Sequence, residues 1–296
     1  MKPANKNLRH YRIGGLTLAV RSDRPITDRT FDPKLRQFQL RAPRRADARI
    51  KLHFALPAAI AFAQGTLVYR KSPWAIYRDK EGWSYVGISR IAGQRPHLVA
   101  RFNKGHTSGD IYVPDDRSWR RGHLKSLTLF PTDQILLARL LADRHSTLLH
   151  SAGLILDGHG LLFLGHSSAG KSTICKMFAR HAEILCDDRN IVRRAGQGFT
   201  LYGTWSHGTF AKISAGHAPL RAMFFLKQSR NNRISRIGNT DEVLKRLLPL
   251  VIRPLADAGW WEKTLDVLES LAACVPAYEL EFDKSGKIIE VLEILA

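Results

Sequence analysis

The chain of 296 residues has no apolar run long enough to cross a bilayer, and residues 1–15 lack the apolar stretch of a secretory signal. Cysteine is scarce: Cys175, Cys186 and Cys274 are the three in the sequence, and they form no metal-binding spacing. An odd number of widely spaced cysteines argues against a disulfide framework. We therefore expect a cytoplasmic protein with no membrane partner.

Acidic residues are few beside basic ones, because 26 Asp and Glu stand against 46 Lys and Arg, a formal net charge of +20. Such a surface attracts nucleotides, nucleic acids, phosphorylated substrates and acidic peptides. The excess is spread along the chain, which argues against a dedicated nucleic-acid patch. One long segment, residues 189–240, contains no acid at all.

The first part of the chain reads as a series of short strands, each bounded by Gly, Pro, Asp or Lys. This pattern is typical of antiparallel strands. We expect residues 1–125 to form a β-rich (α+β) N-terminal accessory domain without a catalytic constellation. The expected strands cover residues 11–20, 50–54, 66–69, 74–77, 84–88 and 97–102.

Residues 126–296 mix helical and strand periods, which predicts an α/β domain with a mixed sheet. The expected helices cover residues 133–142 with Thr132 as cap, 173–179, 240–252 with Thr240 as cap, and 265–273. Pro249 should kink or end the third of these helices. The expected strands cover residues 154–156, 161–164, 183–186, 190–193, 200–202, 221–226 and 278–282, followed by a closing hairpin strand at 288–295.

The stretch from Gly165 to Ser172 reads G-x-x-x-x-G-K-S. In a phosphate-binding loop, backbone N–H groups surround phosphate oxygens, the lysine neutralises the β/γ charge and the serine hydroxyl reaches Mg²⁺. The apolar run 161–164 is typical of a strand before the loop, and residues 173–179 are typical of a helix after it. The partial positive charge at the N-terminus of that helix favours phosphate binding at the loop. We therefore expect this loop to bind ATP through Gly165, Ser167, Ser168, Ala169, Gly170, Lys171, Ser172 and Thr173.

Asp187 and Asp188 follow a predicted strand, at the carboxyl end where α/β sheets place functional groups. Phosphoryl transfer needs a metal ligand and a group that positions or deprotonates the acceptor. We expect one of the two acids to bind the metal and the other to position or deprotonate the acceptor hydroxyl. His150 is a third candidate, and its spacing alone leaves a structural and a catalytic role equally open.

Three motifs in this order, residues 149–153 (LHSAG), 165–172 and 185–188 (LCDD), resemble the HPr kinase/phosphorylase catalytic domain. That domain is similar to the nucleotide core of phosphoenolpyruvate carboxykinase, and the likeness covers about residues 146–230. Among its members, the chain looks most like the HPr-kinase-like proteins of peptide-modification gene clusters. The resemblance implies an active-site role for His150, a phosphate-loop role for Lys171, proton acceptance by Asp188, and a magnesium site formed by Ser172, Asp187 and Asp188.

The chain departs from that family at two places. The family loop is Gly-rich where this chain has Ser168, and the family carries a further metal-binding acid downstream, in the region of the acid-free segment 189–240. The missing acid argues against phosphorylase activity. The segment instead carries many cations, and Lys/Arg clamps stabilise transferring phosphoryl groups. We expect Lys212 and Arg221 to be its phosphate or substrate contacts.

These features predict an ATP- and Mg²⁺-dependent kinase that transfers the γ-phosphate to a hydroxyl, with serine in a peptide, protein or small molecule as first choice. The alternative is a non-catalytic nucleotide-binding regulator or a nucleic-acid-associated ATPase, which the net charge of +20 favours. The sequence is compatible with a homo-oligomer. We expect ATP and a hydroxyl-bearing acceptor as partners, rather than a nucleic acid.

Overall fold

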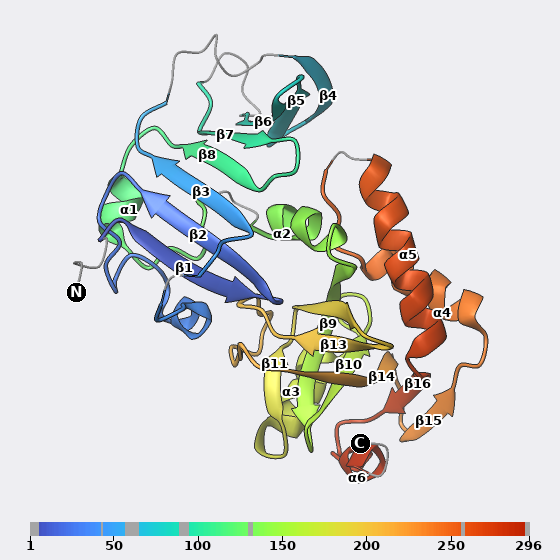
Figure 1. Cartoon of the computed structure of the whole chain (residues 1–296). Helices are drawn as coiled ribbons and strands as arrows, with labels where there is room; N and C mark the ends of the chain where they lie inside the picture. Colours follow the sequence, from blue (N-terminus) through green and yellow to red (C-terminus); the bar gives the residue numbers. More distant parts are fainter. Residues whose placement is uncertain are drawn as a thin grey trace. The chain divides into compact units, whose positions relative to one another are not determined.

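The structure is a computed structural model that describes residues 6–42, 44–56, 65–88, 95–129, 133–255 and 258–293. The chain divides into two compact units, Met1–Leu140 with Pro254–Asp257, and Leu141–Arg253 with Ala258–Ala296. Each unit contains a large mixed sheet, so the fold is mixed α/β (Figure 1). Within the described residues, no helix combines the length and the apolar character needed to span a membrane.

The first unit is built on one eight-stranded sheet. Its strands are β1 (Leu8–Ile13), β2 (Leu16–Ser22), β3 (Ala48–His53), β4 (Thr66–Lys71), β5 (Trp74–Arg78), β6 (Gly82–Gly87), β7 (Leu98–Asn103) and β8 (Ser108–Tyr112). Their order is β1-β2-β3-β8-β7-β6-β5-β4. The pairs β2–β3 and β3–β8 are parallel and the others antiparallel, so the expectation of antiparallel strands is correct only in part. The helical segments are η1 (Pro33–Phe38), α1 (Arg117–Arg121) and α2 (Asp133–Ala142).

The alternating run at residues 11–20 is two strands rather than the one that its pattern predicts. Gly14 and Gly15, with φ of 55° and 79°, turn the chain between β1 and β2, and the register pairs Ile13 with Leu16. Glycine adopts positive φ without steric cost. The two glycines therefore make a hairpin turn, and the alternation simply continues on the other side of it.

The second unit also contains eight strands. They are β9 (Ser146–Leu156), β10 (His159–Leu164), β11 (Glu183–Cys186), β12 (Arg189–Ala195), β13 (Gly198–Tyr202), β14 (His217–Gln228), β15 (Arg233–Arg236) and β16 (Ala277–Phe282). Their order is β10-β9-β12-β13-β14-β16-β15; β11 also pairs with β9, and β10 pairs in parallel with β14. The main helices are α3 (Lys171–Met177), α4 (Thr240–Leu247), α5 (Ala258–Cys274) and α6 (Ile288–Glu293).

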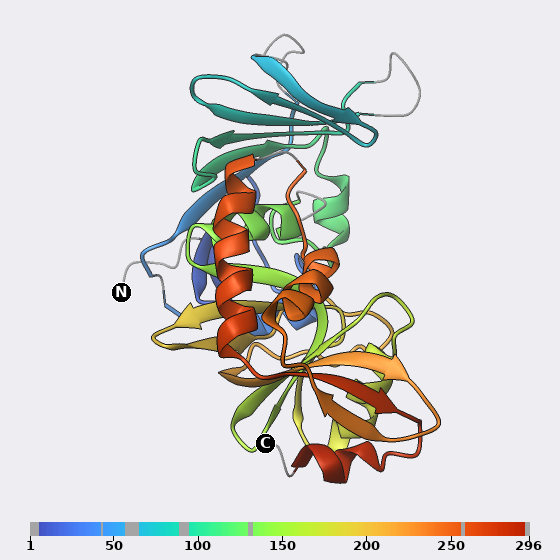
Figure 2. The ribbon, with the colours of Figure 1, turned by 90° about the vertical axis from the view of Figure 1, so that its right-hand side faces the viewer.

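Strand β10 is buried on both faces. Leu161 and Phe163 belong to the core cluster that contains the apolar side chains of α3. Leu162 and Leu164 belong to the cluster that contains those of α4 and α5, two helices that lie side by side (Figure 2). A strand covered on both faces has a continuous apolar sequence, which explains the run at 161–164. Its carboxyl end presents residues 165–170 from a fixed support.

Two helix boundaries test the predicted caps. Helix α4 begins at Thr240, but its cap is Asn239, whose Oδ1 accepts two backbone N–H groups of the first turn at 2.8 and 3.1 Å. Asparagine is a favoured N-cap residue because its side-chain oxygen satisfies these donors, so the assignment to Thr240 is wrong by one residue. The helix ends at Leu247, ahead of Pro249, so that proline ends the helix rather than kinking it, and the predicted extension to residue 252 is wrong. The predicted cap Thr132 lies outside the described residues.

The predicted closing strand at residues 288–295 is wrong, because α6 occupies Ile288–Glu293. Ile288 and Leu292 are both fully buried and four residues apart, which places them on one face of a helix. A short apolar run fits both a strand and a helix by pattern alone. Packing of this one face against the α3 cluster selects the helix.

Candidate functional site

The loop between β10 and α3 has a backbone that depends on glycine (Figure 1). Gly170 has φ of 107°, and a Cβ there would lie 2.5 Å from Phe282 Cζ, so a side chain would be both strained and obstructed. Ser168 also has positive φ, 70°, at the position where the family resemblance predicts glycine. A left-handed backbone costs an L-residue roughly 1–2 kcal/mol. The loop is therefore locally strained at Ser168.

Lys171 opens α3 and is buried, with its side chain folded over its own loop. Its Nζ donates to the backbone oxygens of Gly165 at 2.7 Å and His166 at 2.9 Å. Burial lowers the pKa of Lys171, while the carboxylates of Asp188 and Asp187 act in the opposite direction. The loop thus encloses a cation whose charge interacts with both acids.

Asp187 joins the acid pair to the loop. Its Oδ2 accepts hydrogen bonds from Ser172 Oγ at 2.5 Å and Phe210 N at 2.9 Å, and its Oδ1 accepts one from Gly208 N at 2.6 Å. The side chain is almost fully buried. Hydrogen bonds to a charged group are stronger than neutral ones, so this carboxylate fixes both the first turn of α3 and the chain around Gly208.

Asp188 lies beside the same loop, and its Oδ2 is bound by neighbouring side chains. Its Oδ2 accepts a hydrogen bond of 2.6 Å from Ser206 Oγ and lies 3.5 Å from Arg189 Nη1. Its Oδ1 is 3.6 Å from His150 Nε2, which is too long for a hydrogen bond. Arg189 and His150 are directly opposite in the β9–β12 register. Opposite residues share a face of the sheet, which explains why both meet Asp188.

His150 is partly buried, and burial lowers the pKa of its imidazole. The positive charge of Lys171 lowers it further, whereas Asp188 raises it. An imidazole with a pKa below its usual value of about 6.5 is neutral at pH 7. His150, Lys171 and the acid pair therefore form one electrostatically coupled group.

Small residues of the LHSAG motif allow the strands around His150 to approach closely. A Cβ at Gly153 would lie 2.5 Å from Asn190 Oδ1. Asn190 Nδ2 donates to the backbone oxygen of Ser151 at 2.8 Å, and Ser151 N donates to the backbone oxygen of Asp188 at 3.0 Å. The motif thus positions His150 and Asp188 through the backbone.

The structure does not bring Lys212 and Arg221 to the loop. Lys212 Nζ donates to the backbone oxygen of Ala179 at 3.4 Å, beyond the far end of α3. Arg221 is exposed on β14 beside Gly160, whereas the loop begins after Leu164, four residues further along the parallel strand β10. That separation is about 13 Å at ordinary strand spacing. These positions give no support to contacts of the two cations with the phosphate loop, and their role as substrate contacts stays a prediction.

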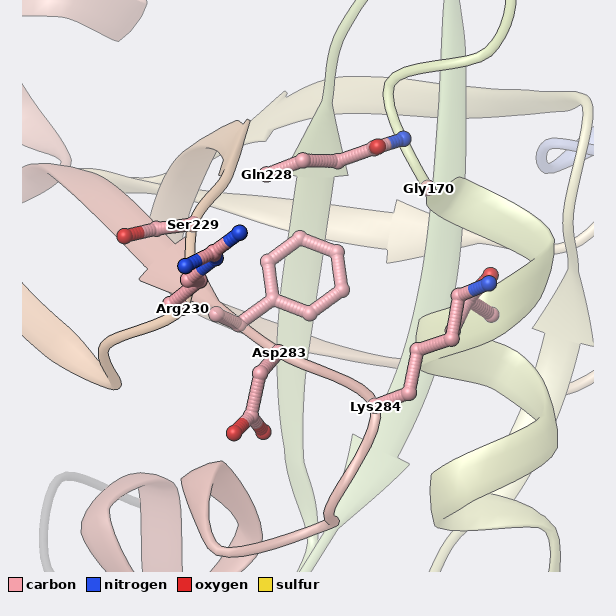
Figure 3. Close-up of a pocket in the computed structure, with 8 residues that line it drawn as sticks. Gly170, Gln228, Ser229, Arg230, Asp283 and Lys284 are labelled. Atoms are coloured by element: carbon pink, nitrogen blue, oxygen red, sulfur yellow. The ribbon is translucent and has the colours of Figure 1, made fainter.

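A pocket of about 380 Å³ adjoins the loop on the side of Gly170 and Thr173 (Figure 3). The buried ring of Phe282 contributes to its wall. Arg230 and Lys284 lie on opposite sides of the pocket. Asp283 also lines the pocket, so its charged side chains are two cations and one acid beside the edge of a mostly buried aromatic ring. A pocket of this kind suits a ligand with both an apolar and a charged part.

Two polar residues at the site were not expected. Gln228 Nε2 donates to the backbone oxygen of Ser168 at 2.6 Å and holds the loop from the end of β14. The sequence could have indicated Gln228. The run 221–226 predicts a buried strand, and a polar residue just after such a strand is a candidate functional residue for the same reason as Asp187 and Asp188. Ser206, which holds Asp188, lies in an irregular segment with no periodicity, so the sequence carried no signal for it.

Among the described residues, no group of three or more His, Cys, Asp and Glu side chains could hold a metal ion. Ser172 Oγ and Asp187 Oδ2 nevertheless place two oxygen donors together beside the loop. Mg²⁺ takes oxygen ligands and often binds through one or two protein groups, with phosphates and waters as the rest. The donor set therefore fits a magnesium ion shared with a phosphorylated ligand.

Comparison with known proteins gives remote similarities. The family model described as SynChlorMet cassette protein ScmC matches residues 128–246, which is less than half of the chain. No curated protein sequence matches the chain. Among solved structures, the Hpr(Ser) kinase/phosphatase from Coxiella burnetii is 10% identical with a TM-score of 0.30, covering 50% of this chain and 92% of that one. The functional argument therefore depends on the geometry of this chain.

Proposed function

We propose that the chain is an ATP- and Mg²⁺-dependent kinase that transfers the γ-phosphate to a hydroxyl, with serine of a peptide, protein or small molecule as first choice. The observation that carries the proposal is the hydrogen bond between Ser172 Oγ and Asp187 Oδ2. It unites the glycine-rich loop with the acid pair. A phosphate cradle, metal ligands and a carboxylate directed at the acceptor are the parts that phosphoryl transfer requires.

Nucleotide binding is assigned to the loop and the pocket next to it. The backbone N–H groups of residues 167–173 surround the phosphates, and Lys171 Nζ exchanges its two carbonyl partners for phosphate oxygens. The pocket beside Thr173, with Phe282 in its wall, takes the nucleoside. Ser172 and Asp187 would hold Mg²⁺. When bound, ATP supplies the phosphoryl group and Mg²⁺ neutralises the charge on its oxygens.

The acceptor is assigned to Asp188. Ser206 and Arg189 fix its Oδ2, which leaves Oδ1 to accept the hydrogen of an incoming hydroxyl. The acceptor oxygen forms the bond to phosphorus, the oxygen bridging the β- and γ-phosphorus atoms leaves with ADP, and the proton passes to Asp188. His150, neutral and 3.6 Å away, orients the acceptor without repelling its proton.

The test is transfer from γ-labelled ATP in the presence of Mg²⁺ to a degenerate peptide library with one fixed serine. The same library with alanine in place of serine is the control. We expect labelled phosphoserine in the serine library alone, and its loss in the Asp188→Asn variant. Equal ADP formation with both libraries and no labelled peptide would indicate an ATPase, and ATP binding without turnover would indicate a regulator; either result contradicts the kinase.

A further inference from the structure

A second cavity, of about 410 Å³, lies in the first unit along strands β1, β2 and β3. Half of its ten lining residues are basic and none is acidic. These five residues, called the groove cations, are Arg21, Arg44, Arg45, Arg49 and Lys51. The cavity is distinct from the loop of the second unit and shares no residue with the site described above.

The strand register explains why three of the groove cations converge. Arg21 is directly opposite Lys51, and Ala19 is directly opposite Arg49, in the parallel pair β2–β3. Directly opposite residues share one face of the sheet. Ile50, between Arg49 and Lys51, is fully buried on the other face. Arg21, Arg49 and Lys51 therefore all project from the solvent-facing side, where the chain around Arg44 and Arg45 forms a wall.

The groove cations differ from neighbouring cations in their ion pairing, although Asp110 lies directly opposite Lys51 in the β3–β8 register. In the same unit, Arg24 pairs with Asp116 at 3.1 Å, and Arg101 pairs with Glu81 at 3.1 Å. Across the part of the chain that the structure describes, none of the groove cations forms such an ion pair. Like charges gathered in a concave surface repel one another and focus a positive potential. An anionic ligand in the groove would remove that repulsion.

Between the cations the lining is mostly apolar, with one imidazole, His10, and no ring of Phe, Tyr or Trp. Leu8, Ala19 and Ala46 supply the apolar side chains. Proteins that bind single-stranded nucleic acid stack successive bases on several aromatic side chains, whereas the lining of this groove includes a single aromatic ring, that of His10. A peptide that alternates acidic and small apolar side chains matches both the cations and the apolar lining. We propose that the groove binds an extended acidic peptide segment, a role that goes beyond the kinase activity and does not depend on it.

The test is a fluorescence anisotropy titration of the full chain with a short labelled peptide of alternating Glu and Ala. The control peptide has Gln in place of Glu. We expect the Glu peptide to bind with an affinity that falls as NaCl is raised, and the Gln peptide to bind at least tenfold more weakly. Equal affinity for the two peptides would overturn the proposal.

Matched double variants locate the binding. Arg49→Ala with Lys51→Ala removes one Arg and one Lys from the groove, and Arg70→Ala with Lys71→Ala removes the same two exposed residue types from β4. We expect a roughly three- to thirtyfold loss of peptide affinity in the groove variant, as two partly solvated ion pairs would give, and less than twofold in the control. Equal loss in both would mean general attraction to a basic protein and would contradict a built groove.

A labelled oligothymidylate of the same net charge tests the competing ligand class. Tighter binding of this strand than of the Glu peptide, with the same sensitivity to the groove variant, would assign the groove to nucleic acid and overturn the peptide proposal. ATP titration of the groove variant separates this proposal from the kinase. Unchanged ATP affinity with lost peptide binding is the expected result, and failure of ATP binding in the wild-type chain would affect the kinase proposal alone.

Discussion

Ser172 Oγ donates a hydrogen bond to Asp187 Oδ2, so the first turn of α3 is tied to the carboxyl end of β11. The two residues are 15 positions apart in the sequence. The same carboxylate also accepts the backbone N–H groups of Gly208 and Phe210. One buried acid thus holds the glycine-rich loop, the acid pair and the irregular segment after β13 in one arrangement.

Replacement of Asp187 should raise the Mg²⁺ requirement of the reaction more than it changes the affinity for ATP. Asp187→Asn keeps the shape but removes the charge, so Ser172 Oγ loses its anionic partner and the metal loses a ligand. We expect the Mg²⁺ concentration for half-maximal turnover to rise roughly tenfold or more, with little change in ATP affinity at saturating Mg²⁺. Turnover measured across a Mg²⁺ series checks this. An unchanged Mg²⁺ requirement would exclude Asp187 from the metal site.

Asp188→Asn should affect transfer and leave binding intact. The amide cannot take a proton from the acceptor, and loss of a general base typically costs ~10²–10⁴-fold in rate. ATP affinity should change little because the loop is untouched. The matched control is Asp157→Asn in the exposed β9–β10 turn, where φ is 47° and Asn fits the left-handed backbone. Transfer by Asp188→Asn at the wild-type rate would mean that Asp188 is not the base.

His150→Ala should slow transfer on the order of 10²-fold through misplacement of the acceptor. Nucleotide binding should persist, since Lys171 is held by its own loop rather than by His150. Single-turnover transfer and ATP titration on the same preparation separate the two effects. A parallel loss of ATP affinity would show instead that His150 supports the loop.

Local sequence pattern predicted the elements around the loop. The apolar run 161–164 and the helical spacing after Lys171 are short-range signals, and the structure has β10 and α3 at these places. The acid pair was expected at the end of a strand, and Asp187 and Asp188 follow β11 directly. These assignments needed only neighbours in the sequence.

The sequence pattern could not predict how far along a strand a given side chain lies, or which distant elements pack together. Lys212 and Arg221 were chosen by charge, but charge does not specify which end of β14 or α3 a side chain reaches. The helix at Ile288–Glu293 is selected by its packing on the α3 cluster, which a short apolar run does not encode. Gln228 meets the loop because β14 runs parallel to β10, and that pairing joins residues far apart in the chain.

The first unit should lose stability in acid through His106. This buried side chain lies 2.9 Å from Tyr85 Oη, and burial, reinforced by the charge of Arg139, lowers the pKa of His106 to about 3. In the unfolded chain the group titrates near 6.5. Between about pH 3 and pH 6.5, His106 is therefore protonated in the unfolded chain and neutral in the folded one. The free energy of unfolding is highest above about pH 6.5 and falls as the pH is lowered towards 3.

We expect this histidine to reduce the free energy of unfolding of the first unit by about 2 kcal/mol between pH 7 and pH 5. Urea unfolding at the two pH values measures it. His106→Asn is the comparison variant, because φ at this position is 54° and Asn tolerates a left-handed backbone. It should flatten the pH dependence by about that amount. The same slope in wild type and variant would contradict the assignment.

The central claim is that residues 165–172 bind the phosphates of ATP, and calorimetric titration with ATP and Mg²⁺ tests it most directly. Lys171→Ala removes the enclosed cation, whereas Lys176→Ala removes an exposed cation from the same helix. A charge-assisted contact contributes about 1.5–3 kcal/mol, so Lys171→Ala should weaken ATP binding roughly ten- to hundredfold and Lys176→Ala should not. Unchanged affinity in Lys171→Ala, or equal loss in both variants, would contradict the assignment of the loop.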